Sequence, residues 1–346
     1  MNKDIESLIR PNIRSLCPYS TARDDYKGSL GVFLDANESP YPTSWNRYPD
    51  PRQTAVKKRL SVIKGIPVEN IFLGNGSDEA IDLVYRIFCE PGRSNAVVIS
   101  PSYGMYSVCA EINDVEVRQV PLGPDFSLPV EELLAACDSN TRLMFVCSPN
   151  NPSGNAFTAE EILSLADRFG GILVVDEAYA DFSRLGSIRQ EVLKRKDIIV
   201  LQTLSKAWGL AALRLGIAFA DSRIIDLMSM VKYPYNISQA TQNEVLKALA
   251  TPVDDKIAEI VSEREKLAAL LPEFGFILKV WPSEANFLLV QTPDPNALYD
   301  HLVRDGIIVR NRNSVAPGCL RITTGLKEEN DKLIESLREY EKGNIR

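Results

Sequence analysis

The sequence predicts an α/β fold in which a large domain with a mostly parallel sheet is followed by a smaller α+β domain. Three apolar runs end near Ser148, Asp176 and Thr203, 28 and 27 residues apart, which is the length of a strand–helix–strand unit. Apolar stretches such as ILVV and IIVL suit strands that are covered on both faces. After about residue 240 the pattern changes to long helices and short strands, and 346 residues are enough for two cores.

The first predicted element is an N-terminal arm, because residues 1–30 hold one short helical pattern followed by prolines and turn residues. The large domain is expected at 31–240 and the small domain at 241–346. Up to residue 122, the predicted elements are a strand at 32–37, a helix at 54–65, a strand, glycine turn and helix within 71–88, and strands at 96–103 and 115–122.

The middle of the chain continues this alternation. A strand starting at Arg142 leads into a turn, and the helix of residues 158–170 opens with a capping-box pattern. Strands follow within 171–179 and 197–206. The next strand, in 214–221, comes too soon for a crossover helix and should run antiparallel to its neighbour. A helix starting near Ile237 is expected to join the small domain to the large one. The predicted elements after it are helical patterns within 242–275, strands at 279–283, 285–291, 307–312 and 319–325, and a final helix.

Composition excludes several classes of function. The net charge of −7 and the pI near 5.1 do not fit a protein that binds nucleic acid. No apolar run approaches the roughly 18 residues of a membrane span, and the N-terminus lacks the apolar core of a secretory signal, so a cytoplasmic location is expected. The single histidine, His301, excludes zinc sites built from several histidines, and no metal site is predicted. The six irregularly spaced cysteines are interpreted as free thiols.

Three polar residues follow the ends of predicted strands: Asn151, Asp176 and Lys206. Ligands of such sheets bind beyond the carboxyl ends of the strands, so these side chains should converge on one site. A lysine is usually a solvated surface residue, but partial burial beside Trp208 would lower its pKa and free the amine for imine formation. Asp176 could be a helix cap, or the anion that pyridoxal phosphate needs at its ring nitrogen.

A phosphate site is predicted next to these residues. Gly74 and Gly76 permit a tight turn before a helix whose N-terminus offers free N–H groups, and the planar fork of Arg214 suits a phosphate. Ser77 and Asp78 could equally be ordinary helix caps. Similar alternatives stay open for the other candidates: Tyr103 and Tyr179 could be packed core tyrosines, and Asn151 could only open a turn.

Taken together, the motifs SPNNPSG, VVDEAY and TLSKAWGLAALRLG resemble the fold-type-I pyridoxal-phosphate aminotransferases. Further segments resemble one branch of the class II subgroup, the histidinol-phosphate aminotransferases: CPYSTAR, LDANESPY, NRYPDPRQ, LGNGSDEAIDL, SPSYGMY, SEANFLLV, GIIVRNR and GCLRITTG. The resemblance covers nearly the whole chain. It implies a large domain with a mostly parallel seven-stranded sheet between helices and a smaller α+β domain. Ala212 and Ser153 depart from the usual motifs without removing a functional group.

The resemblance also implies residue roles. Lys206 would hold pyridoxal 5'-phosphate as a Schiff base and move the substrate Cα proton, with Asp176 and Tyr179 as the other catalytic groups. Cofactor contacts are implied for Gly76, Ser77, Asp78, Tyr103, Asn151, Asp176, Tyr179, Ser205, Lys206 and Arg214, and for Tyr48 across a homodimer with shared active sites. Substrate contacts are implied for Tyr19, Asn286, Arg310 and Arg321. Arg312 lies so close to Arg310 that either could meet the substrate phosphate.

The reaction that the resemblance implies is reversible amino transfer between L-histidinol phosphate and 2-oxoglutarate, giving imidazole acetol phosphate and L-glutamate, in histidine biosynthesis. An aromatic amino-acid aminotransferase and a threonine-phosphate decarboxylase are the alternatives on the same scaffold. A non-enzymatic pyridoxal-phosphate-binding regulator is a more distant alternative, because such regulators usually carry a DNA-binding domain and none is expected here.

Overall fold

The computed structural model describes residues 4–21 and 31–344, so part of the predicted arm lies outside the described residues. Its larger layer is a seven-stranded sheet in the order β1-β7-β6-β5-β4-β2-β3. Four neighbouring pairs are parallel, whereas β7 runs antiparallel to both β6 and β1. The strands are β1 (Ile71–Asn75), β2 (Asn95–Ser100), β3 (Glu116–Pro121), β4 (Thr141–Cys147), β5 (Ile172–Asp176), β6 (Ile198–Thr203) and β7 (Leu215–Phe219).

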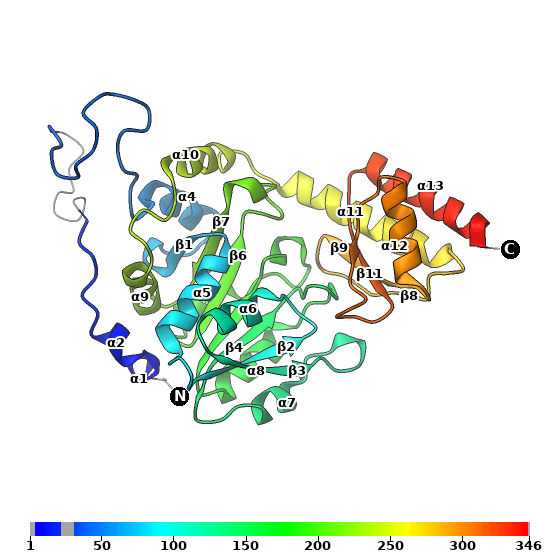
Figure 1. Ribbon diagram of the computed structural model, residues 1–346, viewed down its shortest axis with the longest axis horizontal. Coiled ribbons are helices and arrows are strands. Elements are labelled where there is room, and N and C mark those ends of the chain that lie inside the picture. Colours follow the sequence, from blue (N-terminus) through cyan, green and yellow to red (C-terminus); the bar gives the residue numbers. More distant parts are fainter. Residues whose placement is uncertain (1–3, 22–30, 345–346) are drawn as a thin grey trace.

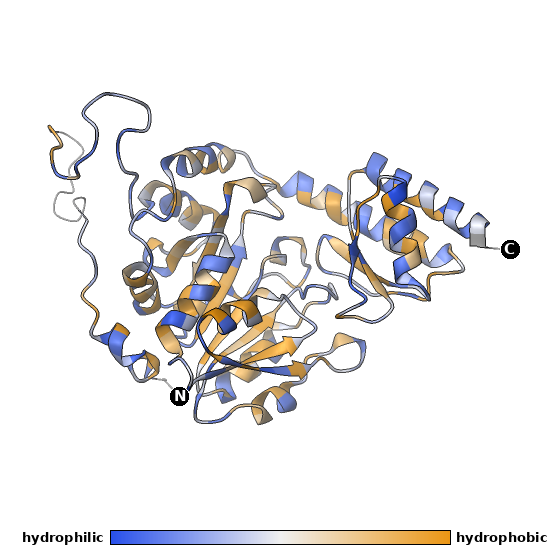
Figure 2. Ribbon diagram, in the orientation of Figure 1, coloured by the Kyte–Doolittle hydropathy of each residue, from blue (hydrophilic) through white to orange (hydrophobic). Residues whose placement is uncertain are grey.

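Helices pack on this sheet because each presents an apolar stripe to it. Figure 2 shows the strands mostly in the orange of hydrophobic residues, whereas the helices have both an orange, hydrophobic face and a blue, hydrophilic face. The helices around this sheet are α1 (Ile5–Leu8), α2 (Pro11–Arg14), α4 (Thr54–Lys64), α5 (Ser77–Phe88), α6 (Met105–Ile112), α7 (Val130–Ala135), α8 (Ala159–Arg168), α9 (Ser222–Val231) and α10 (Gln239–Ala248). Short 3-10 turns lie at Val68–Asn70, Pro124–Phe126, Ala180–Phe182, Arg189–Leu193, Ala211–Leu213 and Leu271–Glu273.

A second layer is a four-stranded antiparallel sheet in the order β10-β11-β9-β8, covered by three helices (Figure 1). Its elements are α11 (Asp254–Leu270), β8 (Lys279–Val280), β9 (Phe287–Gln291), α12 (Pro295–Arg304), β10 (Arg310–Asn311), β11 (Cys319–Thr323) and α13 (Lys327–Asn344). One face of the sheet, with Leu320 and Ile322, joins a separate apolar core with the helices. The other face carries Phe287, which packs with Tyr179 and Phe182 of the larger layer.

The predicted fold class is confirmed: an α/β protein with a mostly parallel seven-stranded sheet and a smaller α+β part. The antiparallel strand β7 is also as predicted. The strand expected at 32–37 is wrong, because this segment pairs with no strand of the described residues, and Val32 is 88% and Leu34 87% exposed. The domain boundaries at 30 and 240 stay a prediction. Val245 and Leu249 pack in the core of the larger sheet, so α10 lies with that sheet.

None of the helices in the described ranges is long and apolar enough to cross a membrane. The cytoplasmic location stays a prediction.

Candidate active site

A pocket of about 140 Å³ opens at the carboxyl ends of β4, β5 and β6, beside the N-terminus of α5. Parallel strands deliver their carboxyl ends to one edge of the sheet, so residues distant in sequence meet there. The pocket is lined by Gly76, Ser77, Asp78, Tyr103, Cys147, Asn151, Asp176, Ala178, Tyr179, Thr203, Ser205, Lys206, Ala211 and Arg214. All ten residues that the sequence predicts around a cofactor within one subunit are among them.

Lys206 follows β6 in a turn, and its side chain stays accessible to solvent. Its Nζ atom lies 5.6 Å from the centre of the Tyr179 ring. Partial burial of the amine within the pocket lowers the pKa of Lys206, and the positive charges of Arg321 and Arg214 act in the same direction. The amine therefore loses its proton more readily than that of a surface lysine, which makes it a nucleophile and a base.

Asp176 is the last residue of β5, and it is 3% exposed. Its Oδ2 accepts a hydrogen bond from the Tyr106 hydroxyl at 2.8 Å, and its Oδ1 accepts one from the Ala178 N–H at 3.0 Å. Burial raises the pKa of Asp176, while these two hydrogen bonds and the charge of Lys206 oppose that shift. A buried carboxylate aimed into a cavity is costly, and it is suited to a cationic ligand group.

The opposite side of the pocket is suited to an anion. The first N–H groups of α5 have no partner within the helix, and the helix dipole favours negative charge at that end. Gly76 adopts φ +79°, and a Cβ there would lie 2.6 Å from Nη2 of Arg214. Arg214 has φ +54°, and its carbonyl oxygen accepts from the Gly76 N–H at 2.8 Å. Its guanidinium is also 3.5 Å from Asp78.

Two aromatic residues form the walls. The Tyr103 hydroxyl donates to Oδ1 of Asp78 at 3.0 Å, and the Tyr103 ring meets Tyr106 edge-on at 5.7 Å. Tyr179 is buried and meets Phe287 of β9 edge-on at 5.2 Å. Burial raises the pKa values of both Tyr103 and Tyr179, so their hydroxyls stay protonated and can donate hydrogen bonds.

Asn151 connects the pocket to the smaller sheet. Its Oδ1 accepts a hydrogen bond from Nη1 of Arg321 on β11, which leaves the Asn151 amide N–H groups free to donate. Arg321 also lies over the Phe287 ring, with its Cζ 5.1 Å from the ring centre. Asn151, which follows β4 of the larger sheet, thus contacts Arg321 of the smaller sheet beside the pocket.

Three arginines share the face of the smaller sheet that is turned to Tyr179. Arg321 lies directly opposite Arg310 in the β10–β11 register, and Arg312 is two residues beyond Arg310. Burial lowers the pKa values of Arg321 and Arg312, and neighbouring arginines add to the shift. Within the described residues, the buried Nε atoms of Arg312 and Arg321 have no hydrogen-bond partner, and no carboxylate lies within ion-pair distance of the three. An unpaired cationic face of this kind is suited to an anionic ligand.

Besides Arg321, four residues with predicted substrate or cofactor contacts do not line the pocket. Tyr48 and Tyr19 are exposed and line two other surface hollows of about 580 Å³ each. Arg310 is exposed on β10, and Asn286 precedes β9, where its carbonyl oxygen accepts from the Thr324 N–H. The ring of Tyr48 stacks on Tyr235 at 4.5 Å, so within its own chain it is held away from Lys206.

Sequence reasoning missed Tyr106, Thr203 and Cys147. Tyr106 stands three residues after Tyr103, and the spacing of one helical turn was the only available signal. The Thr203 hydroxyl donates to the Ser205 Oγ at 3.0 Å, and Cys147 lies opposite Asp176 in the β4–β5 register. His301 does not line this pocket, and its Nε2 lies 3.0 Å from the Ser336 carbonyl oxygen.

Comparisons with known proteins bear on this site. The family description "Aminotransferase class I and II" matches residues 34–337. A histidinol-phosphate aminotransferase of Parabacteroides distasonis is 50% identical over 340 residues, 97% of this chain and 99% of that one. That of Christiangramia forsetii is 46% identical over 98% of each chain.

The chain belongs to the class I and II aminotransferase family. Within it, the full-length relatives above place the chain in the histidinol-phosphate aminotransferase branch.

Solved structures share the fold of this family member. The histidinol-phosphate aminotransferase of Sinorhizobium meliloti in complex with pyridoxal-5'-phosphate has a TM-score of 0.79 and 24% identity, covering 96% of this chain and 97% of that one. The L-threonine-O-3-phosphate decarboxylase of Porphyromonas gingivalis has a TM-score of 0.68 and 21% identity, covering 85% and 90%. At these identities the likeness shows the fold alone.

Proposed function

We propose that this aminotransferase interconverts L-histidinol phosphate and 2-oxoglutarate with imidazole acetol phosphate and L-glutamate, as a step of histidine biosynthesis. The observation that carries the proposal is the gathering of Lys206, Asp176 and Arg214 around one pocket, with an unpaired arginine face turned to it. The full-length relatives that bear this enzyme's name, at 42–50% identity, support the substrate assignment.

The donor set of the pocket fits pyridoxal 5'-phosphate. The N-terminus of α5, Ser205 and Arg214 would hold the phosphate, and the Gly76 position leaves room where a Cβ would collide with Arg214. Asp176 would pair with the ring nitrogen, and Asn151 and Tyr179 would donate to the ring oxygen. When bound, the cofactor supplies an electron-withdrawing ring that stabilises negative charge at the substrate Cα.

The residues of the chain then have distinct tasks. Lys206 would hold the cofactor and, once free, take the proton from the substrate Cα and return it, which its lowered pKa favours. Tyr103 would lie against the ring. Asp176 would keep the ring nitrogen protonated, because a buried carboxylate favours a positive charge beside it.

Arg321 and its neighbours would bind the second anionic group of each substrate. A phosphate on one substrate and a second carboxylate on the other both fit the planar fork of an arginine. Between the two remaining candidates, the buried Nε of Arg312 favours this residue over the exposed Arg310 as the partner of the phosphate.

The proposal includes a homodimer with shared active sites. Tyr48 lies in an exposed segment together with Tyr41 and Trp45, which are 79% and 62% exposed, and all three project outside the pocket of their own chain. Contact with a second copy would bury this apolar surface. In that arrangement Tyr48 would complete the site of the partner subunit.

The test is a product analysis of the purified protein with pyridoxal 5'-phosphate, L-glutamate and a panel of 2-oxo acids and phosphorylated ketones. We expect imidazole acetol phosphate to be converted with a higher kcat/KM than any aromatic oxo acid. Release of carbon dioxide from threonine phosphate without 2-oxoglutarate would identify the decarboxylase instead, and cofactor binding without turnover of any substrate would identify a regulator.

Lys206→Ala supplies the matching test of mechanism. It should remove the absorbance that is specific to the lysine-attached cofactor and lower amino transfer by more than about 10³-fold, since it deletes both the attachment point and the base. Lys57→Ala, a lysine that does not line this pocket, is the control and should leave the cofactor absorbance intact. Wild-type turnover by Lys206→Ala would refute the assignment.

A further inference from the structure

Tyr106 of α6 lies directly behind the pocket and is not among the residues that line it. It is 1% exposed, its ring stacks on Phe145 of β4 at 4.9 Å, and its edge meets Tyr103. Its hydroxyl is the only side-chain donor to the Asp176 carboxylate among the described residues. This single hydroxyl thus connects the wall of the pocket to its buried acid.

A second tyrosine offers an internal comparison. Tyr85 of α5 is 0% exposed and stacks on the same Phe145 ring at 5.3 Å. Its hydroxyl, however, has no hydrogen-bond partner among the described residues. The two tyrosines therefore contribute similar apolar packing, and they differ in whether the hydroxyl reaches Asp176.

From this geometry we infer that Tyr106 is a positioning residue for cofactor binding: its hydroxyl fixes the Asp176 carboxylate in its orientation and keeps it ionised. Asp176 Oδ1 is held by the Ala178 N–H, so the bond to Oδ2 fixes the second oxygen and with it the plane of the carboxylate. A hydrogen bond to a carboxylate favours its charged form. The inference rests on the proposed use of pyridoxal 5'-phosphate, and it concerns how the chain prepares its acid for the ring nitrogen.

The electrostatic surroundings agree with this role. Burial raises the pKa of Tyr106, so the hydroxyl keeps its proton and acts as the donor. Burial also raises the pKa of Asp176, and the bond from Tyr106 is the largest opposing influence. The titratable groups that face Asp176 are Asp78, Tyr103, Tyr106, Cys147, Tyr179 and Lys206.

The experiment compares Tyr106→Phe with the matched variant Tyr85→Phe by measuring the dissociation constant of pyridoxal 5'-phosphate from the full-length protein at several pH values. A hydrogen bond to a charged group corresponds to about a tenfold change in affinity or more. We expect Tyr106→Phe to weaken cofactor binding by about that factor, and Tyr85→Phe to leave it unchanged. The loss of affinity at low pH should also begin at a higher pH in Tyr106→Phe, because Asp176 is protonated more easily.

A double-mutant cycle separates positioning from packing. In an Asp176→Asn background, Tyr106→Phe should have little further effect on cofactor affinity, since the charge that it serves is gone. Equal weakening by Tyr106→Phe and Tyr85→Phe, or an undiminished effect of Tyr106→Phe in the Asp176→Asn background, would overturn the inference. So would wild-type affinity in Tyr106→Phe.

A second substitution keeps the hydroxyl and enlarges the side chain by only one small atom. Incorporation of 3-fluorotyrosine at position 106 makes the hydroxyl a stronger donor, and it should tighten cofactor binding and shift its loss to lower pH. Unchanged binding would count against the inference. All of these measurements report cofactor binding and not amino transfer. A failure of the substrate assignment would therefore not change them, and it could be told apart from a failure of this inference.

Discussion

Among single residues, Gly216 shows how an absent side chain can build a site. It lies on β7 opposite Gly74 of β1, and a Cβ at this position would lie 2.1 Å from the backbone nitrogen of Ser77. Because that atom belongs to the start of α5, no side-chain rotation could relieve the collision. The close approach of β7 to the anion-binding turn therefore requires glycine at this position.

Gly216→Ala should accordingly displace the start of α5, lower the free energy of unfolding by about 1–3 kcal/mol and weaken binding of pyridoxal 5'-phosphate. Gly170→Ala is the control, because a Cβ added at this position would have no atom within 4 Å apart from its chain neighbours. Thermal unfolding of the two variants with and without the cofactor measures both effects. If Gly216→Ala matched Gly170→Ala in both respects, the close approach would not matter.

The sequence predicted most of the pocket at this scale. Lys206, Asp176 and Asn151 could be placed together because each follows a strand end, and strand ends are visible in an apolar pattern. Tyr106 could not be found in this way, because its contact with Asp176 crosses from a helix to the sheet. The contacts of Tyr48 and Tyr19 stay predictions, since a single chain does not place them at the pocket.

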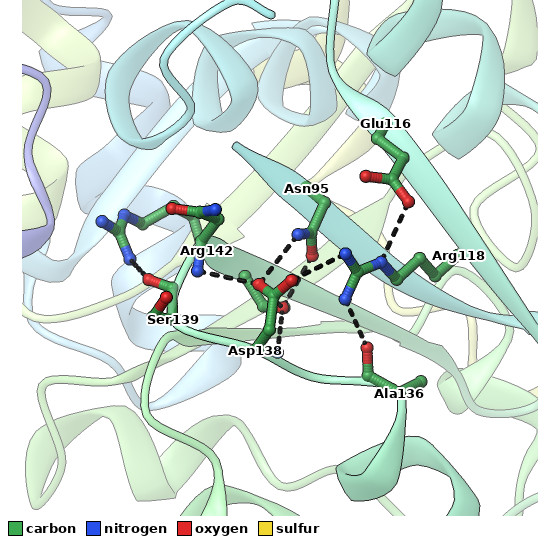
Figure 3. A network of polar contacts seen from close by, with 9 residues as sticks. Asn95, Glu116, Arg118, Ala136, Asp138, Ser139 and Arg142 are labelled. Carbon is green, nitrogen blue, oxygen red and sulfur yellow. Dashed lines mark hydrogen bonds and ion pairs between the residues drawn. The ribbon is translucent and has the colours of Figure 1, made fainter. Parts of the chain in front are cut away.

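Between elements, a polar network joins three strands at the end of the sheet away from the pocket (Figure 3). The Asp138 carboxylate accepts from Asn95 at the start of β2 at 3.0 Å and from Arg118 of β3 at 2.7 Å. Thr141 at the start of β4 donates to the Asn95 side chain at 2.6 Å. The hydrogen bonds from Asn95 and Arg118 lower the pKa of Asp138 below its ordinary value.

This shift predicts a pH dependence of stability. A carboxyl group with a lowered pKa stabilises the folded state above its ordinary value of 3.8, and the contribution is lost as the pH falls through the folded-state pKa. Asp138→Asn should therefore lower the Tm near neutral pH by roughly a few degrees, and the difference should shrink in acid.

The control for this prediction is Glu132→Gln in the adjacent helix α7, an exposed carboxylate that should leave the Tm unchanged. Melting curves recorded from pH 7 down to about 3 compare the variants with the wild type. A constant difference at every pH would show that Asp138 acts through shape and not through charge.

Elements were predictable where hydrophobic period and spacing agreed. The strands β4, β5 and β6 show both an apolar run and the expected spacing. Too few residues separate β6 from β7 for a crossover helix, which predicted that β7 runs antiparallel to β6. The segment 32–37 shows the limit of such reasoning, because its short apolar run forms no strand with any described residue. Its exposed Val32 and Leu34 indicate that its apolar partners are not found within the described part of one chain.

At the scale of the whole molecule, the proposed homodimer makes a quantitative prediction. Tyr48→Ala and Lys206→Ala should each be nearly inactive alone. After mixing and exchange of subunits, half of the dimers would contain one of each, and each such dimer would have one site with both native residues. The mixture should then recover about a quarter of wild-type activity, as the symmetry of a two-fold dimer requires.

Activity of the mixture equal to the mean of the two separate variants would refute sharing of sites. Tyr41 lies in the same exposed segment but does not line the hollow that contains Tyr48. Tyr41→Ala is therefore the control for Tyr48→Ala, and it should be active on its own. Analytical ultracentrifugation of each preparation establishes that dimers are present.

The arginine face has a consequence for how a substrate is held. Arg321 lies on β11 of the smaller sheet with Arg312 nearby, and Lys206 follows β6 of the larger sheet, so a substrate whose two ends reach both would connect the two sheets. The binding energy of its distal anion would then hold the reactive end of the substrate in place at Lys206, and it would contribute to the rate of the chemical step. A dephosphorylated substrate should have a lower kcat even at saturation, because its reactive end would be held less firmly at Lys206.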